Sequence, residues 1–173
     1  MKLRHAILGL LARSPQSGYD LSRAFASSVV HFWHADQSQI YRTLDRMEAD
    51  GAISTQTIIQ NGRPNRRIHS LTEAGKAELE AWLASPLEPR LSKDPLLARI
   101  FFAAPLGHEK VNMLLGEAEN HLRAELAALR AIEFEVEDLD TTLKHATLRY
   151  GIDEIALGLK MIEQIRESIA NMK

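Results

Sequence analysis

The feature that most constrains the fold is the segment IIQNGRPNRRIHSL at residues 58–71. Apolar residues stand at both of its ends, and Asn-Gly followed by Pro-Asn, two dipeptides typical of turns, lie between them. The segment therefore predicts a β-hairpin. Arg63, Arg66 and Arg67 occur within five consecutive positions, so the tip of this hairpin should carry positive charge into solvent.

Helical patterns lie on both sides of this hairpin. Apolar periodicity and turn residues predict helices over residues 3–11, 18–28, 36–50 and 72–84. Gly51 follows the third helix at the position where glycine is favoured after a helix end. The order helix, helix, helix, hairpin, helix predicts a winged helix-turn-helix domain with a two-stranded wing.

The segment SPLEPRLSKDP at residues 85–95 is the best candidate for a domain boundary, because it holds three prolines and little periodicity. Asp94 and Pro95 form a good cap and first position for a helix over PLLARIFFAA. That helix is apolar nearly all round, which predicts burial. We therefore expect its Phe101 and Phe102 to be core or dimer contacts.

Two long helices should follow, from about His108 to Glu137 and from about Thr142 onward. In the first, apolar residues recur every seven positions, at Leu115, Leu122, Leu129 and Val136. The short acidic connection between them predicts an antiparallel pair. The expected protein is mostly α-helical, with a winged helix-turn-helix domain at residues 1–84, a linker at 85–95 and an antiparallel helical dimerisation domain at 96–173.

Composition narrows the class of protein. Residues 1–84 carry a net charge of +2 and residues 85–173 one of −4, which together give the chain's −2. The absence of cysteine excludes disulfides and thiolate metal sites. No apolar run is long enough to span a membrane, and the N-terminus lacks a signal cleavage site, so we expect a cytoplasmic protein. His31 and His34 have no third metal ligand nearby in sequence, and we expect no metal and no cofactor.

The segment DQSQIYRTLDRMEADGAI, residues 36–53, predicts a two-sided helix. Ile40, Leu44 and Met47 fall on one side, and polar residues fall on the other. Ser, Gln and Arg side chains can reach base edges in the major groove, and the N-terminal part of such a helix usually goes deepest. The candidate DNA contacts of this helix are Ser38, Gln39, Tyr41, Arg42 and Arg46. Two alternatives remain: an ordinary solvated helix side, and Tyr41 at the edge of the core.

We then interpret the basic hairpin as a wing, which lies along the phosphate backbone of DNA or in its minor groove. Arg63, Asn65 and Arg66 are assigned to DNA. Arg67 begins the returning strand, where a charge that keeps an edge strand soluble explains it better. A charged, soluble turn without DNA contacts is the alternative for the whole hairpin.

Three segments resemble the PadR family of bacterial transcriptional regulators: AILGLLARSPQSGYDL, SQIYRTLDRMEADGAI and GRPNRRIHSLTEAGKAELEAWL. The helical remainder is similar to the C-terminal region of virulence-activator-like members. The resemblance implies a homodimer that binds a pseudo-palindromic operator in double-stranded DNA and usually represses. It also implies dimerisation through the C-terminal helices and a small, often aromatic effector, for which Trp33 and Trp82 are candidate pocket residues; ordinary core positions are the alternative.

Two functions of different classes follow. The first is a sequence-specific DNA-binding regulator, and the alternative is a winged-helix module that binds an acidic protein without reading DNA sequence. An enzyme is not expected, because the sequence has no P-loop, no G-x-G-x-x-G before a helix, no G-x-S-x-G and no metal-ligand cluster.

Overall fold

The computed structural model describes residues 2–27, 35–59, 65–87, 94–133 and 135–172. The chain divides into two compact units, Met1–Glu88 and Pro89–Lys173. Among the described residues no helix combines the length and apolarity needed to cross a membrane.

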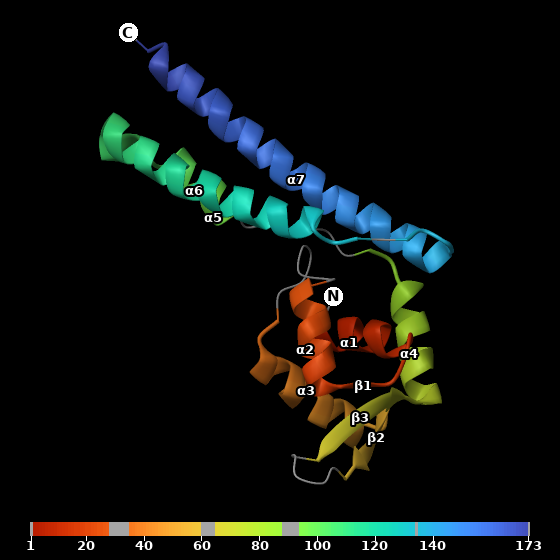
Figure 1. The fold of residues 1–173 in the computed structure, drawn as a ribbon. Helices are drawn as coiled ribbons and strands as arrows, with labels where there is room; N and C mark the ends of the chain where they lie inside the picture. The colour runs from red at the N-terminus through yellow and green to blue at the C-terminus, as the bar shows by residue number, and fades with distance from the viewer. Residues whose placement is uncertain (1, 28–34, 60–64, 88–93, 134, 173) are drawn as a thin grey trace. The chain divides into compact units, whose positions relative to one another are not determined.

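The first unit has the predicted order of helices and hairpin (Figure 1). Its elements are α1 (Leu3–Leu11), β1 (Gln16–Ser17), α2 (Gly18–Ser27), α3 (Gln37–Ala49), β2 (Ile53–Ile58), β3 (Arg66–Leu71) and α4 (Glu73–Leu83). The winged helix-turn-helix is thereby confirmed. The short strand β1 was not predicted, because it lies in a segment whose sequence indicates only the end of α1.

The sheet has three strands in the order β1-β3-β2, so β3 lies in the middle (Figure 1). Along the hairpin the antiparallel register runs from Ile53 opposite Leu71 to Ile58 opposite Arg66. On the other side of β3, Gln16 pairs with His69. The pairing with β1 attaches the wing to the start of α2.

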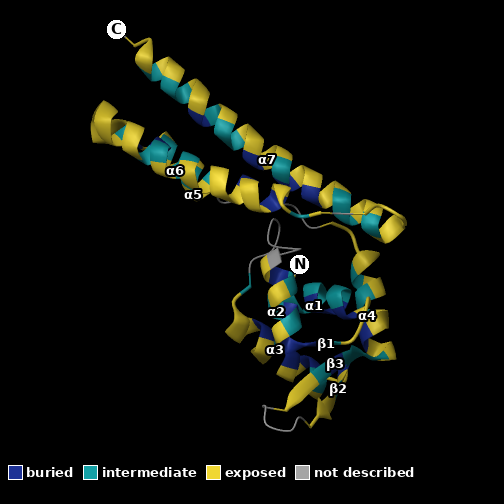
Figure 2. Ribbon diagram, viewed as in Figure 1, coloured by how far each residue is buried: buried dark blue, intermediate teal, exposed yellow. Residues whose placement is uncertain are grey.

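The core of the first unit follows from helical spacing. Helices α2 and α3 each bury one apolar side and leave the other in solvent, whereas every residue of α1 is buried or half-buried (Figure 2). The buried residues are Ile7, Leu8, Leu11, Leu21, Phe25, Ile40, Leu44, Met47, Ala52 and Ile53.

The start of α4 is held against the start of β2. Thr72 caps α4 by accepting a hydrogen bond from the backbone N–H of Gly75 at 3.1 Å. The same hydroxyl donates to the carbonyl oxygen of Ala52 at 2.9 Å. One threonine therefore joins the helix end to the wing.

The second unit contains α5 (Pro95–Phe101), a 3₁₀ turn η1 (Ala104–Leu106), α6 (Gly107–Arg130) and α7 (Leu139–Ala170). The side chain of Asp94 accepts hydrogen bonds from Leu96 N and Leu97 N, which confirms the predicted cap. Helices α6 and α7 lie side by side and antiparallel, as predicted (Figure 1). Residues on the predicted apolar rows are buried between them: Leu115, Leu129, Leu148, Ile155 and Ile162.

The predicted end of α6 at Glu137 is wrong. The helix ends at Arg130, and Val136 lies beyond it with 51% of its surface exposed. Val136 therefore does not continue the sevenfold row. The apolar row alone could not show this, because a side chain at the right spacing need not belong to the same helix.

The next helix also begins earlier than the predicted Thr142, at Leu139. Asp138 caps it: its side chain accepts from the N–H of Thr141 at 2.8 Å, and the Thr141 hydroxyl accepts from the N–H of Asp138 at 3.0 Å. This capping box requires extended backbone at Asp138, which is incompatible with a helix continuing through it.

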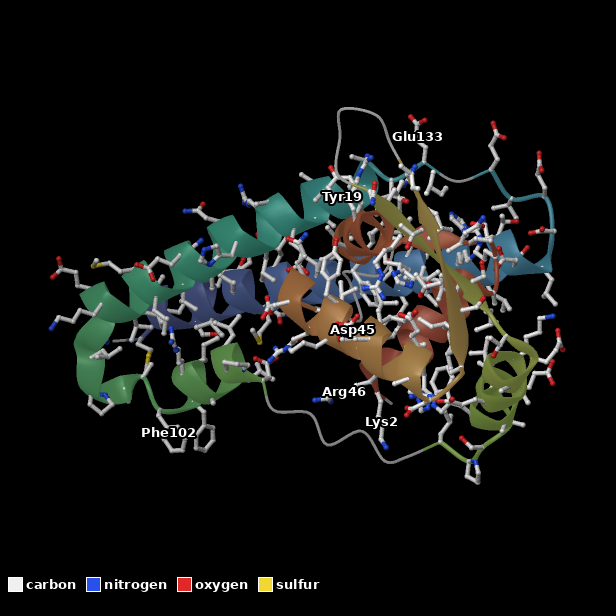
Figure 3. The ribbon with its side chains drawn as sticks, turned by 90° about the horizontal axis from the view of Figure 1, so that it is seen from below. Lys2, Tyr19, Asp45, Arg46, Phe102 and Glu133 are labelled. Carbon is white, nitrogen blue, oxygen red and sulfur yellow. The ribbon has the colours of Figure 1, made fainter. Side chains whose placement is uncertain are left out.

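The expected burial of α5 is wrong for the single chain. Phe101 and Phe102 are 79% and 74% exposed. Their rings meet edge to face, with centroids 4.9 Å apart, and Phe102 projects away from α6 (Figure 3). The described residues of one chain do not cover this apolar surface.

Candidate nucleic-acid interface

Helix α3 presents the polar side that its sequence predicts. The α3 residues proposed to contact DNA are all exposed: Ser38, Gln39, Tyr41, Arg42 and Arg46. Arg42 Nε donates a hydrogen bond to the carbonyl oxygen of Ser38 at 3.2 Å. This contact turns the guanidinium toward the N-terminal turn of the helix, the part that enters a major groove most deeply in helix-turn-helix proteins.

Tyr41 is positioned by the first residue of α2. A Cβ atom on Gly18 would lie 2.6 Å from Cε1 of the Tyr41 ring, closer than two such atoms can approach. The tyrosine ring therefore lies directly on the α2 backbone, and a side chain larger than that of glycine at position 18 would displace it. This contact keeps Tyr41, which is 41% exposed, at the outer edge of α3.

An open groove of about 500 Å³ lies between the start of α2, α3 and β3. It brings together three of the proposed DNA contacts, Tyr41, Asn65 and Arg66, with Tyr19 and Asp20 of α2. The other α3 candidates do not line it. The groove shows that the base of the wing and α3 form one continuous surface.

Arg66 and Arg67 at the base of the wing are both paired with acidic groups. Arg66 Nη2 lies 2.5 Å from Asp20 Oδ2 on α2. Arg67 contacts Glu48 and, at 3.3 Å, Asp45, both on α3. The hairpin is thus tied to both helices of the helix-turn-helix by ion pairs that its sequence alone did not indicate.

Two proposed site residues, Arg63 and Trp33, lie outside the described residues, as do His31 and His34. The second candidate for an effector pocket, Trp82 on α4, is half-buried and stacks on His5 of α1, with ring centroids 4.8 Å apart. Part of its ring is therefore covered within the first unit. Where the chain is described, no group of three or more His, Asp or Glu residues could hold a metal ion.

His69 also lines the groove between α2, α3 and β3, and the sequence did not single it out. It is 2% exposed, and its Nδ1 lies 3.0 Å from Thr55 Oγ1 across the hairpin. Burial lowers the pKa of His69, and Arg67 lowers it further, while Glu48 and Asp45 act in the opposite direction. Its place on the buried side of β3 could be found only once the strand register was known.

We expect the free energy of unfolding to fall as the pH drops below about 6.5, the ordinary pKa of histidine. The unfolded chain binds a proton there, whereas the pKa of buried His69 is lowered and its ring stays neutral in the fold. Above that pH the ring is neutral in both states and contributes no pH dependence. Burial also lowers the pKa of His5, which adds a slope of the same sign.

Thermal unfolding of the wild type and the His69→Gln variant between pH 7.5 and 5.5 measures this effect. Glutamine can still hydrogen-bond to Thr55, so the variant should fold and show a shallower decline. Parallel declines for the two proteins would contradict the role assigned to His69.

Two sequence models of protein families match the chain. Residues 7–81 match the Transcriptional regulator PadR-like family, and residues 92–169 match Virulence activator alpha C-term. The two matches fall on the two compact units.

Individual relatives agree with these matches. The negative transcriptional regulator PadR of Bacillus subtilis is 33% identical over 130 residues, which are 74% of this chain and 71% of that protein. The probable transcriptional regulator Rv1176c of Mycobacterium tuberculosis is 44% identical over 89 residues, 51% of this chain. That match spans about half of the relative, 47% of its length.

Solved structures of the Bacillus subtilis protein match as well. Its crystal structure in complex with operator DNA has a TM-score of 0.82 at 28% identity, covering 96% of this chain and 98% of that one. Its structure in complex with p-coumaric acid has a TM-score of 0.77 at 26% identity, covering 98% and 99%. With the winged helix-turn-helix and its polar α3 already established, these matches show that the chain belongs to the PadR-like family of transcriptional regulators.

Proposed function

We propose that this regulator binds a specific operator in double-stranded DNA as a homodimer and acts as a repressor that a small effector releases. The observation that carries the proposal is the continuous surface formed by exposed polar residues of α3 and the base of the wing. The Bacillus subtilis relative, a negative regulator with a structure on operator DNA, supports it.

In this proposal α3 occupies the major groove. Ser38, Gln39 and Arg42 contact base edges or nearby phosphates, and Arg42 reads guanine with two hydrogen bonds. Tyr41 and Arg46 contact the phosphate backbone. The wing contributes Arg63, Asn65 and Arg66, along the backbone or in the minor groove. The sequence boundaries at 1–84, 85–95 and 96–173 then separate DNA binding, connection and dimerisation.

The homodimer interface is proposed on the C-terminal helices. Large apolar side chains of the second unit are exposed in the single chain, which is typical of a surface that another protein covers. They include Phe101, Phe102, Leu143, Tyr150 and Leu157. A second copy of this unit would remove them from water and place two α3 helices on one DNA.

A small aromatic effector is proposed because the Bacillus subtilis relative has a structure with p-coumaric acid. Trp33 and Trp82 remain the candidate pocket residues. A tenfold loss of DNA affinity needs only about 1.4 kcal/mol of differential binding between the two states. We propose a cytoplasmic location, because a repressor acts where its promoter is.

Selection of bound duplexes from a random DNA pool at two salt concentrations tests the function. We expect an inverted repeat whose half-sites lie about one or two helical turns apart, and a dimer by light scattering. The triple variant Arg42→Ala, Arg63→Ala, Arg66→Ala is the control and should recover no repeat. Binding without sequence preference, or a triple variant with full affinity, would favour a module that binds an acidic protein instead.

A further inference from the structure

The side chain of Asp20 lies on the proposed DNA-binding surface, although a carboxylate there repels phosphate. It lines the same groove as Tyr41, Asn65 and Arg66. Its Oδ2 is 2.5 Å from Nη2 of Arg66, and the two side chains are 34% and 48% exposed. A negative charge at this place therefore acts on the wing arginine before any DNA arrives.

The carboxylate of Asp20 is held in place from its other side. Its Oδ2 accepts hydrogen bonds from the backbone N–H of Ser17 at 3.1 Å and from the Ser17 hydroxyl at 2.7 Å. The Ser17 hydroxyl in turn accepts from the N–H of Asp20 at 3.2 Å, which forms a capping box at the start of α2. These bonds, with Arg66, lower the pKa of Asp20.

The capping box distinguishes the ion pair between Asp20 and Arg66 from most surface ion pairs. An exposed pair usually contributes little, because two flexible side chains lose entropy when they meet. Here the capping box has already ordered the carboxylate, and Ser17 is 6% exposed and pairs with β3 through β1. The pair therefore keeps the Arg66 guanidinium at one place at the base of the wing.

We infer that Asp20 is a specificity-determining residue, which by pairing with Arg66 withholds this charge from indiscriminate phosphate contacts and presents it at one fixed point. The inference rests on the proposed function. The ion pair engages Nη2, and an arginine carries N–H groups on three nitrogens. A phosphate at the position that the bound operator sets can therefore still be contacted, whereas a guanidinium free to move would contact phosphates in many registers.

The test compares the wild type with Asp20→Asn on two duplexes of equal length, the sequence recovered by the selection above and a mixed sequence. Asparagine retains an oxygen that can accept from Ser17, so the cap of α2 persists while the charge is lost. We expect affinity for the mixed duplex to rise about 1.4- to fivefold, the range that an exposed ion pair spans. The ratio of operator to mixed-sequence affinity should fall, and the salt dependence should steepen by about one phosphate contact per protomer.

Glu73→Gln is the matched control. It removes one negative charge from an exposed ion pair with Lys76 on α4, outside the groove. A change in overall charge would affect both variants alike, whereas the inference expects the affinity ratio to fall only in Asp20→Asn. The double variant Asp20→Asn, Arg66→Ala should have the same ratio as Arg66→Ala alone, because Asp20 acts through Arg66.

The possible outcomes distinguish failure of the role assigned to Asp20 from failure of the proposed function. Equal weakening of both duplexes by Asp20→Asn, an unchanged ratio, or an equal effect in the Arg66→Ala background would overturn the role of Asp20 alone. Failure of the wild-type protein to prefer any sequence would overturn the proposed function and, with it, this inference.

Discussion

Gly75→Ala is expected to lower the free energy of unfolding by about 2–4 kcal/mol, the sum of an overpacked core position and a weakened helix cap. Gly75 is buried in the first turn of α4, and a Cβ atom there would lie 2.2 Å from the carbonyl oxygen of Ala52. The clash is between the new methyl group and a backbone atom, so rotation of a side chain cannot relieve the clash. A second clash, at 2.8 Å, involves the Leu71 side chain.

The backbone around this site cannot move cheaply. The Ala52 carbonyl accepts from the Thr72 hydroxyl at 2.9 Å and from the Thr72 N–H at 3.2 Å. Moving α4 away would break these bonds and the cap at the same time. The wing would then lose its attachment to α4, so the effect should extend to DNA binding.

Urea denaturation at neutral pH measures the loss. Gly9→Ala is the matched control, because a Cβ on Gly9 in α1 meets nothing within 4 Å. Alanine is the better helix former by about 1 kcal/mol, so this variant should be as stable as the wild type or more so. Equal midpoints for the two variants would show that the contact between α4 and Ala52 is looser than the structure has it.

Arg42→Ala is the second change with a large expected effect. On the selected operator it should cost about 1–3 kcal/mol per half-site, and base preference should relax at one position of each half-site. The reason is the direction of the guanidinium, which the contact with the Ser38 carbonyl turns toward the N-terminal turn of α3. Affinity for mixed-sequence DNA should change much less.

Arg46→Ala provides the comparison on the same side of α3, one turn further from the N-terminus. It should weaken binding to operator and mixed sequence alike and reduce the salt dependence by about one phosphate contact, without changing base preference. Both arginines are exposed, so neither variant should unfold the protein. Selection of binding sites with each variant measures the outcome, and unchanged base preference in Arg42→Ala would remove this residue from base reading.

Much of the first unit was predictable because its signals are local. The apolar positions Ile40, Leu44 and Met47 lie within two turns of one helix, so their spacing predicts both its buried side and the exposed side that we propose to contact DNA. Turn chemistry between two apolar runs predicted the hairpin in the same way. The cap formed by Asp94 follows from its own position before Pro95.

The end of α6 shows where a local signal can mislead. A sevenfold apolar row continues through Val136, yet the capping box at Asp138 begins a new helix and requires extended backbone. The apolar spacing alone did not show that α6 ends at Arg130, well before the cap at Asp138. Phe101 and Phe102, expected to be core or dimer contacts, are exposed in the single chain, so apolar character alone did not distinguish these two alternatives.

The contacts that shape the proposed DNA-binding surface join residues far apart in the chain. Asp20 and Arg66 are separated by 46 positions, and the ring of Tyr41 lies on Gly18 of another helix. Charge and residue type could propose Arg66 as a DNA contact, but they could not show which carboxylate holds it. Spacing along a chain describes one helix or hairpin at a time, whereas the partners of a side chain depend on how those elements pack.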